Sequence, residues 1–102
     1  MSPLQRSVKQ LRAEGWIVAK VEHWNPWGKV RQDLFGILDL LCIQDIHTLG
    51  VQVTTMGQKQ PHMRKMKASK MLPLLKKANW IIILHSWRKL KKTGWTLDVE
   101  IL

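Results

Sequence analysis

The chain has 102 residues and carries 17 Lys and Arg against 7 Asp and Glu, a formal net charge of +10. This length supports one domain with one modest core and excludes two, so we expect a single domain over residues 1–102. The excess of cations repels itself unless a polyanion lies against the surface, which makes nucleic acid the first partner to consider.

Cysteine use and hydropathy indicate the compartment. The single cysteine, Cys42, lies in an apolar run and cannot form an internal disulfide, which favours core packing in a reducing cytoplasm. No secretory signal opens the chain, and its longest apolar runs fall far short of the ~20 residues that a membrane helix needs. We therefore expect a cytoplasmic protein without membrane contact.

Capping residues and hydrophobic spacing predict a helix at the start of the chain. Ser2 fits the N-cap, Pro3 the first helical position and Gln5 the capping box, while Gly15 supplies a stop. The segment 16–24 then alternates with period two, which predicts the first strand.

Two further strands are expected after the turn residues 25–28. Segments 34–43 and 49–55 are rich in strand formers and predict a hairpin that turns at 44–47. The polar and glycine-containing residues 57–62 predict a loop.

The second half of the chain predicts a helix and a second hairpin. Residues 63–78 predict a helix that Pro73 divides or restarts. The apolar run 80–84 predicts a buried central strand, and a turn at 92–94 returns the chain as the strand 95–101. The resulting order of helix, three strands, helix and two strands indicates an α/β fold.

A carboxylate-free interval from residue 46 to residue 97 carries eleven cations, which points to DNA or RNA contact. With the cations of the first loop added, the expected phosphate-binding residues are Lys29, Arg31, Lys59, Arg64, Lys65, Lys67, Arg88 and Lys89. Trp24, Trp27 and Trp87 lie beside polar or basic positions, where an indole either stacks on an unpaired base or packs in a core or dimer contact.

Asp39 is a carboxylate among residues that would fill a core. Gln52 and Thr54 share a face of the next strand, and the hairpin register brings them beside Asp39 if the pairing is in phase. Oxygen ligands of this kind suit a hard cation such as Mg²⁺. Two interpretations stay open here: a metal site, or an aspartate that only accepts local hydrogen bonds, for example from Arg31.

The segments FGILDLLCI (35–43) and LGVQVTT (49–55), in this order of elements, resemble the PD-(D/E)xK nuclease superfamily. Within it the chain is most similar to small Holliday-junction-resolvase-like and VRR-NUC-like nucleases of phages and prokaryotes. The resemblance covers residues 2–84. It implies a restriction-endonuclease-like αβββαβ core, a mixed central sheet flanked by helices, with an added C-terminal strand. It also implies a homodimeric, Mg²⁺- or Mn²⁺-dependent DNA endonuclease selective for branched or junction DNA, in a prokaryotic or phage-infected cytoplasm.

Carried over by position, Asp39 is the metal-binding aspartate, Gln52 stands at the second acid as a further metal ligand, and Thr54 stands at the lysine. Gln52 lacks the charge of an acid, and Thr54 lacks that of a lysine. Lys20, Lys29, Arg31 and Lys59 are the nearest replacements in sequence for that cation.

Glu22 and Asp33 are the carboxylates expected to complete the site, ahead of Glu14 and Gln5 of the first helix. The alternative is an inactive DNA-binding or accessory module on the same fold. A third possibility is a basic RNA-binding domain unrelated to nucleases. All four histidines are expected not to bind metal.

Overall fold

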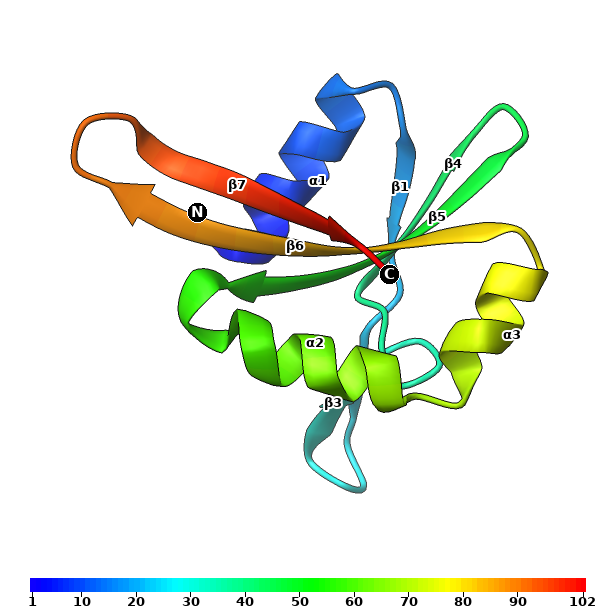
Figure 1. The fold of residues 1–102 in the computed structure, drawn as a ribbon. Coiled ribbons are helices and arrows are strands. Elements are labelled where there is room, and N and C mark those ends of the chain that lie inside the picture. The colour runs from blue at the N-terminus through cyan, green and yellow to red at the C-terminus, as the bar shows by residue number, and fades with distance from the viewer.

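The computed structural model describes all residues, 1–102, as a mixed α/β structure built around a five-stranded sheet (Figure 1). Its helices and strands, in chain order, are α1 (Pro3–Ala13), β1 (Ile17–Lys20), β2 (His23–Asn25), β3 (Val30–Gln32), β4 (Leu40–Gln44), β5 (His47–Thr55), the 3₁₀ turn η1 (Met56–Gln58), α2 (Lys59–Ala68), α3 (Met71–Lys77), β6 (Trp80–Leu90) and β7 (Gly94–Ile101). The predicted α/β class is confirmed. No helix combines the length and apolar character needed to cross a bilayer.

The main sheet has the strand order β1-β4-β5-β6-β7, with β5 in the middle. Strands β1, β4 and β5 pair antiparallel, as do β6 and β7. Only β5 and β6 pair parallel, because helices α2 and α3 carry the chain back across the sheet between them. The sheet is therefore mixed, as the sequence predicts.

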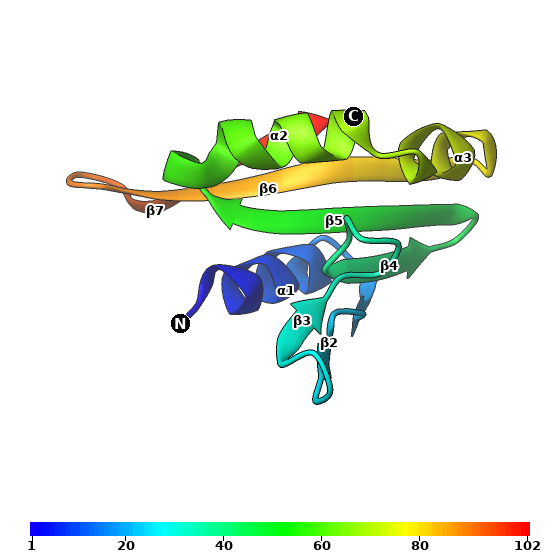
Figure 2. The same cartoon turned by 90° about the horizontal axis from the view of Figure 1, so that it is seen from below.

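The helices cover opposite faces of the sheet (Figure 2). One buried cluster joins α1 to the strands and contains Val8, Leu11, Leu40, Cys42, Leu49, Val51 and Ile83. The other lies under α2 and α3 and contains Ile37, Leu38, Met63, Met66, Leu72, Leu75, Ile82 and Leu84. Successive residues of β5 alternate between these clusters, so Gln52 and Thr54 face the side of α2.

The start of α1 is built as predicted. The Ser2 hydroxyl accepts a hydrogen bond from the Gln5 N–H at 3.1 Å, and Gln5 Oε1 accepts one from the Ser2 N–H at 2.8 Å. This reciprocal capping box, with Pro3 in the first turn, satisfies two amides that the helix leaves free. The local residues alone therefore define where the first helix begins.

The single strand predicted over 16–24 is wrong: the chain forms two short strands in different sheets. Strand β1 ends at Lys20, and β2 pairs only with β3, which lies between the turn residues 25–28 and the next predicted strand, where no strand was predicted. The Val21 N–H donates to the Asp39 carbonyl at 2.9 Å, and beyond it the chain leaves the main sheet. The β2–β3 hairpin projects from the body of the molecule (Figure 1, Figure 2).

The strand predicted over 34–43 is correct only in its second half. A tight turn precedes β4, with Phe35 and Gly36 at positive φ values of 54° and 76°. This turn places Leu38 against Gly50 of β5, where a Cβ atom would lie 2.7 Å from Leu38 Cδ1. The apolar composition of residues 34–38 predicted a strand, but these residues form a turn whose side chains pack against the face of the sheet.

The helical region also differs from the prediction. The expected loop at 57–62 is wrong, because η1 and the first turn of α2 occupy it. The break falls at Ser69 and Lys70, and Pro73 lies inside the first turn of α3, where a missing N–H leaves no helical bond unmade. Strand β6 runs beyond 80–84 to Leu90 and lies beside the central strand rather than at the centre.

Candidate functional site

Asp39 lies directly before β4, at the position opposite Gln52 of β5. Its Oδ2 accepts two hydrogen bonds of 2.8 Å, one from Gln52 Nε2 and one from the Val53 N–H. Asp39 is 5% exposed and Gln52 is 3% exposed. The pairing predicted from strand geometry between these two residues is therefore confirmed, and one carboxylate oxygen of Asp39 keeps no protein donor among these bonds.

Only one of the two polar atoms of the Gln52 side-chain amide has a hydrogen-bond partner. Its amide nitrogen is used by Asp39, but its Oε1 is buried without a hydrogen-bond partner. A buried carbonyl oxygen without a donor costs about 1–3 kcal/mol. Gln52 lines the same pocket as Asp39, and its oxygen is therefore a buried acceptor without a donor next to that carboxylate.

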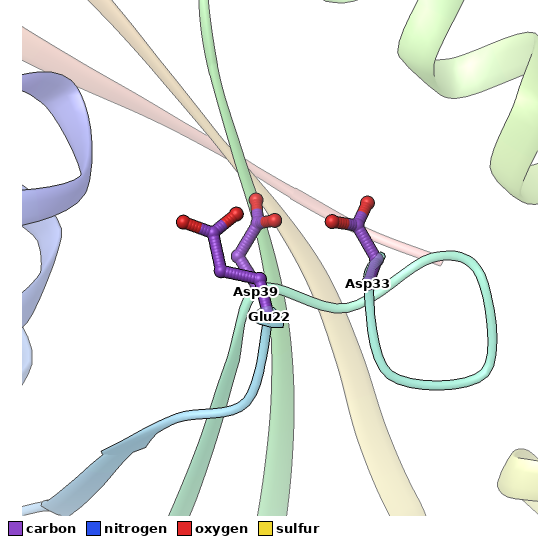
Figure 3. Close-up of side chains that lie close together, drawn as sticks. All are labelled: Glu22, Asp33 and Asp39. Carbon is purple, nitrogen blue, oxygen red and sulfur yellow. The ribbon is translucent and has the colours of Figure 1, made fainter. Parts of the chain in front are cut away.

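Glu22 and Asp33 bring two more carboxylates to Asp39. One ligand oxygen from each of the three residues lies within 4.8 Å of the others. Glu22 directly precedes β2 and Asp33 directly follows β3, so the projecting hairpin carries an acid at each end of its base. Figure 3 shows the three carboxylates directed into a shared space from separate segments of the chain. Their expected approach to Asp39 is confirmed.

The electrostatics of this cluster oppose full ionisation. Burial raises the pKa of Asp39 to about 8; the hydrogen bond from the Val53 N–H lowers it, and the charge of Asp33 raises it further. Two cations compensate in part: Arg31 Nη1 lies 3.0 Å from Glu22 Oε1, and Lys65 Nζ lies 3.8 Å from Asp33 Oδ2. Arg31 therefore pairs with Glu22 and forms no bond to Asp39.

A pocket of about 370 Å³ surrounds the acids. Its lining includes Pro3 and Leu4 of α1, Thr54 of β5 and His62 of α2. His62 Nδ1 lies 3.3 Å from Thr54 Oγ1 and 2.9 Å from the Gln58 carbonyl oxygen. The sequence reasoning missed His62 because it assigned the segment to a loop, whereas a helix from Lys59 turns this residue toward the end of β5.

The expected cations fall into two groups. Lys59 is not available as a phosphate contact or as the missing lysine, because its Nζ pairs with Asp98 at 2.8 Å and Glu100 at 2.9 Å. The others lie on exposed positions of α2, of the β2–β3 hairpin and of the end of β6: Lys29, Arg31, Arg64, Lys65, Lys67, Arg88 and Lys89. Glu14 at the end of α1 is exposed and bonds to Gln10, and it does not line the pocket.

A second groove, of about 530 Å³, runs beside α1 and carries three cations, none of which was among the expected phosphate-binding residues. Lys9 and Arg12 of α1 and Lys20 of β1 line it. Gln5 lines this groove and its neighbour Leu4 lines the acidic pocket, so the two concavities adjoin along α1. The helical periodicity of α1 could have identified this basic face.

The tryptophans separate by exposure. Trp87 is 7% exposed and donates from Nε1 to the Ser7 hydroxyl at 2.8 Å, so it is a core residue and cannot stack on a base. Trp27 is 95% exposed near the tip of the β2–β3 hairpin, and Trp24 is 57% exposed on β2. Asn25 Oδ1 accepts hydrogen bonds from the Trp27 and Gly28 amides, which fixes the turn that displays the indole.

No family model matches this chain, and no curated protein matches it either.

Proposed function

We propose that the protein is a metal-dependent DNA endonuclease built on a restriction-endonuclease-like core. The mixed sheet supports this proposal: β1, β4 and β5 pair antiparallel, and a crossover through α2 and α3 leads to the parallel strand β6. Asp39, directly before β4, and Gln52 and Thr54 of β5 are the residues that the resemblance assigns to the motif, and Glu22 and Asp33 approach Asp39 from the base of the β2–β3 hairpin. The added strand β7 extends the sheet past β6.

The observation that carries this proposal is the convergence of Glu22, Asp33 and Asp39 in a molecule with a net charge of +10. Only 7 of the 102 residues are acidic, and three of them gather within 4.8 Å. Gathering like charges destabilises a fold unless a cation relieves the repulsion. Arg31 offsets the charge of Glu22 and Lys65 that of Asp33, whereas Asp39 has no cationic partner.

The residues present fit a hard divalent cation. Glu22, Asp33 and Asp39 supply carboxylate oxygens, and Gln52 supplies an amide oxygen that has no other partner. Oxygen donors of this kind suit Mg²⁺ or Mn²⁺ rather than a metal that prefers nitrogen or sulfur. Such an ion, when bound, would lower the pKa of a coordinated water and stabilise charge on a phosphate oxygen.

The chain's own cations hold the substrate in this proposal. The exposed face of α2, with Arg64, Lys65 and Lys67, borders the acids through Lys65, and the basic groove of α1 adjoins them from the other side. Contacts of this kind give affinity that falls with salt and carries little sequence preference. A DNA strand that crosses the acidic pocket can therefore place phosphates against cations on both sides of it.

The exposed indole of Trp27 favours a substrate with unpaired bases. A side chain of this size that is 95% exposed buries almost no apolar area in the protein. Stacking on an unpaired base is worth about 1–3 kcal/mol, and the hairpin that carries Trp27 starts and ends at Glu22 and Asp33. We therefore propose branched, flapped or frayed DNA as the preferred substrate. The homodimer that the resemblance implies stays a prediction.

The alternative is a DNA-binding module without catalysis. It is favoured by the uncharged Gln52 and Thr54, which stand where the superfamily has an acid and a lysine. This alternative keeps the fold, the cations and the exposed indole, and it differs only in the chemistry of the acidic pocket.

The deciding experiment compares cleavage of linear duplex, single-stranded, flapped and four-way DNA with Mg²⁺ or Mn²⁺. Asp39→Asn is the test variant, because an amide oxygen can accept both bonds that Asp39 Oδ2 accepts. Asp45→Asn, in the exposed β4–β5 turn, is the matched control. We expect the wild type and the control to cut while Asp39→Asn binds without cutting. Salt-dependent binding without cutting by the wild type would instead establish the binding module.

A further inference from the structure

His62 reaches the place in the pocket where the motif of the superfamily has its lysine. Thr54 stands at that position and offers no base. Residue 62 belongs to the first turns of α2, which packs over the end of β5, and its ring nitrogen Nδ1 lies 3.3 Å from Thr54 Oγ1. A nitrogen base from a different element therefore borders the acidic pocket beside Thr54.

The hydrogen bonds of His62 decide which ring nitrogen is free. Nδ1 lies 2.9 Å from the Gln58 carbonyl oxygen, and a carbonyl can only accept, so Nδ1 carries the proton. The neutral ring then holds its lone pair on Nε2. Gln58 and Thr54 contact the ring on its Nδ1 side, which leaves Nε2 as the unoccupied acceptor on a ring that lines the pocket.

The other bases near this position are already engaged. Lys59, one turn earlier on α2, pairs with Asp98 and Glu100 of β7. Arg31 pairs with Glu22, and Lys65 lies 3.8 Å from Asp33 and carries its charge as an ammonium without a lone pair. Of these residues, only His62 is a pocket-lining base whose ring has a nitrogen without a hydrogen-bond partner.

We propose that His62 is the general base of the hydrolysis, in place of the lysine. This assignment rests on the proposed function. A water oxygen forms a bond to the phosphorus of the phosphodiester and gives its proton to His62 Nε2. One ester P–O bond breaks with its electron pair, and the departing oxygen takes a proton from solvent. Thr54 is a positioning residue in this step, because its hydroxyl oxygen lies 3.3 Å from Nδ1 and contacts the ring on that side.

The test uses His62→Ala and His62→Gln in the full chain, with His47→Ala as the matched control at the exposed first residue of β5, the end of that strand opposite Thr54. Single-turnover cleavage is measured at saturating protein with Mg²⁺. Removal of a general base lowers the rate about 10²–10⁴-fold. We expect that loss in both His62 variants and the wild-type rate in His47→Ala. DNA affinity and the Mg²⁺-induced rise in melting temperature are expected to equal those of the wild type.

Two further readouts separate a base from a structural residue. Added imidazole is expected to restore part of the rate of His62→Ala and none of that of Asp39→Asn. Nitrogen-15 NMR of the metal-free wild type, with the ring assigned by its loss in His62→Gln, is expected to show the Nδ1-protonated tautomer.

The outcomes separate the two proposals. A wild-type rate in His62→Ala, with Asp39→Asn inactive, would overturn the role of His62 and leave the nuclease intact, as would an Nε2-protonated ring. A wild type that cuts none of the four DNA forms would overturn the proposed function and this assignment together.

Discussion

Replacing Asp39 by Asn is expected to stabilise the metal-free protein. Both hydrogen bonds to this side chain arrive at Oδ2, from Gln52 and Val53, so the oxygen of an asparagine amide accepts them unchanged. The amide nitrogen then takes the place of Oδ1 and donates toward the neighbouring carboxylates. The substitution removes the buried titrating group without removing a contact or creating a cavity.

The size of the effect follows from the pKa of Asp39, which burial raises from 3.8 to about 8. The folded protein therefore keeps a proton that the unfolded chain has released, and the free energy of unfolding falls as pH rises between these two values. Each pH unit in this window removes about 1.4 kcal/mol. Between pH 4 and pH 7 the wild type is expected to lose on the order of 4 kcal/mol relative to Asp39→Asn.

The assay is denaturant unfolding followed by tryptophan fluorescence, at intervals from pH 4 to pH 8 in the presence of EDTA. The two proteins are expected to have similar stability at pH 4 and to diverge as pH rises, with Asp39→Asn the more stable. Adding Mg²⁺ at pH 8 is expected to stabilise the wild type, because only the folded state holds the acids together, and to leave the variant unchanged. Asp45→Asn serves as the control for loss of one negative charge.

A difference between wild type and Asp39→Asn that stays constant from pH 4 to pH 8 would refute the reasoning, as would a variant less stable than the wild type at pH 7 in EDTA. Either result would mean that Asp39 is ionised without cost in the metal-free fold. Equal stabilisation of both proteins by Mg²⁺ would place the ion elsewhere.

Three further predictions concern packing, substrate and acid stability. Gly50→Ala is expected to lower the free energy of unfolding by about 1–3 kcal/mol, measured by denaturant titration, because its Cβ would lie 2.7 Å from Leu38 Cδ1. Trp27→Ala is expected to leave the melting temperature unchanged and to weaken binding of flapped DNA, but not of linear duplex, in fluorescence anisotropy; equal weakening of both would contradict a stacking role. Burial lowers the pKa of His85 to about 4, so the unfolded chain binds a proton below pH 6.5 that the fold excludes, and this group lowers the free energy of unfolding as pH falls from 6.5 to 4, opposite in sign to the contribution of Asp39. His85→Asn is expected to gain stability relative to the wild type as pH falls through this window in an acid titration, and a constant difference between the two proteins would contradict it.

Features set by neighbouring residues could be predicted from the sequence. The capping box of α1 depends on Ser2 and Gln5, three positions apart, and the structure forms it. The β4–β5 hairpin was predicted to bring Asp39 beside Gln52 if its strands paired in phase, and the structure has that register. The principal pair of the candidate site was therefore predicted conditionally, with the register left to the structure.

Features that depend on how separate helices, strands and turns pack against one another could not be predicted in this way. The alternation over 16–24 is equally compatible with one strand or with two, and only the bond from Val21 to the Asp39 carbonyl decides where the chain leaves the sheet. Apolar residues at 34–38 satisfy a strand pattern, yet they fold back over Gly50. Periodicity fixes which residues share a face, but it does not say what covers that face.

The sequence by itself determined the α/β class and the basic character of the molecule, and it indicated that Asp39 could pair with Gln52, because each depends on composition or on short-range geometry. The tertiary structure alone decided that the β2–β3 hairpin brings Glu22 and Asp33 to Asp39, and that α2 presents His62 at Thr54. The same packing directs Lys59 to the acids of β7 and buries Trp87. Such contacts join segments far apart in the chain, and their energies depend on burial and charge that exist only once the elements have packed.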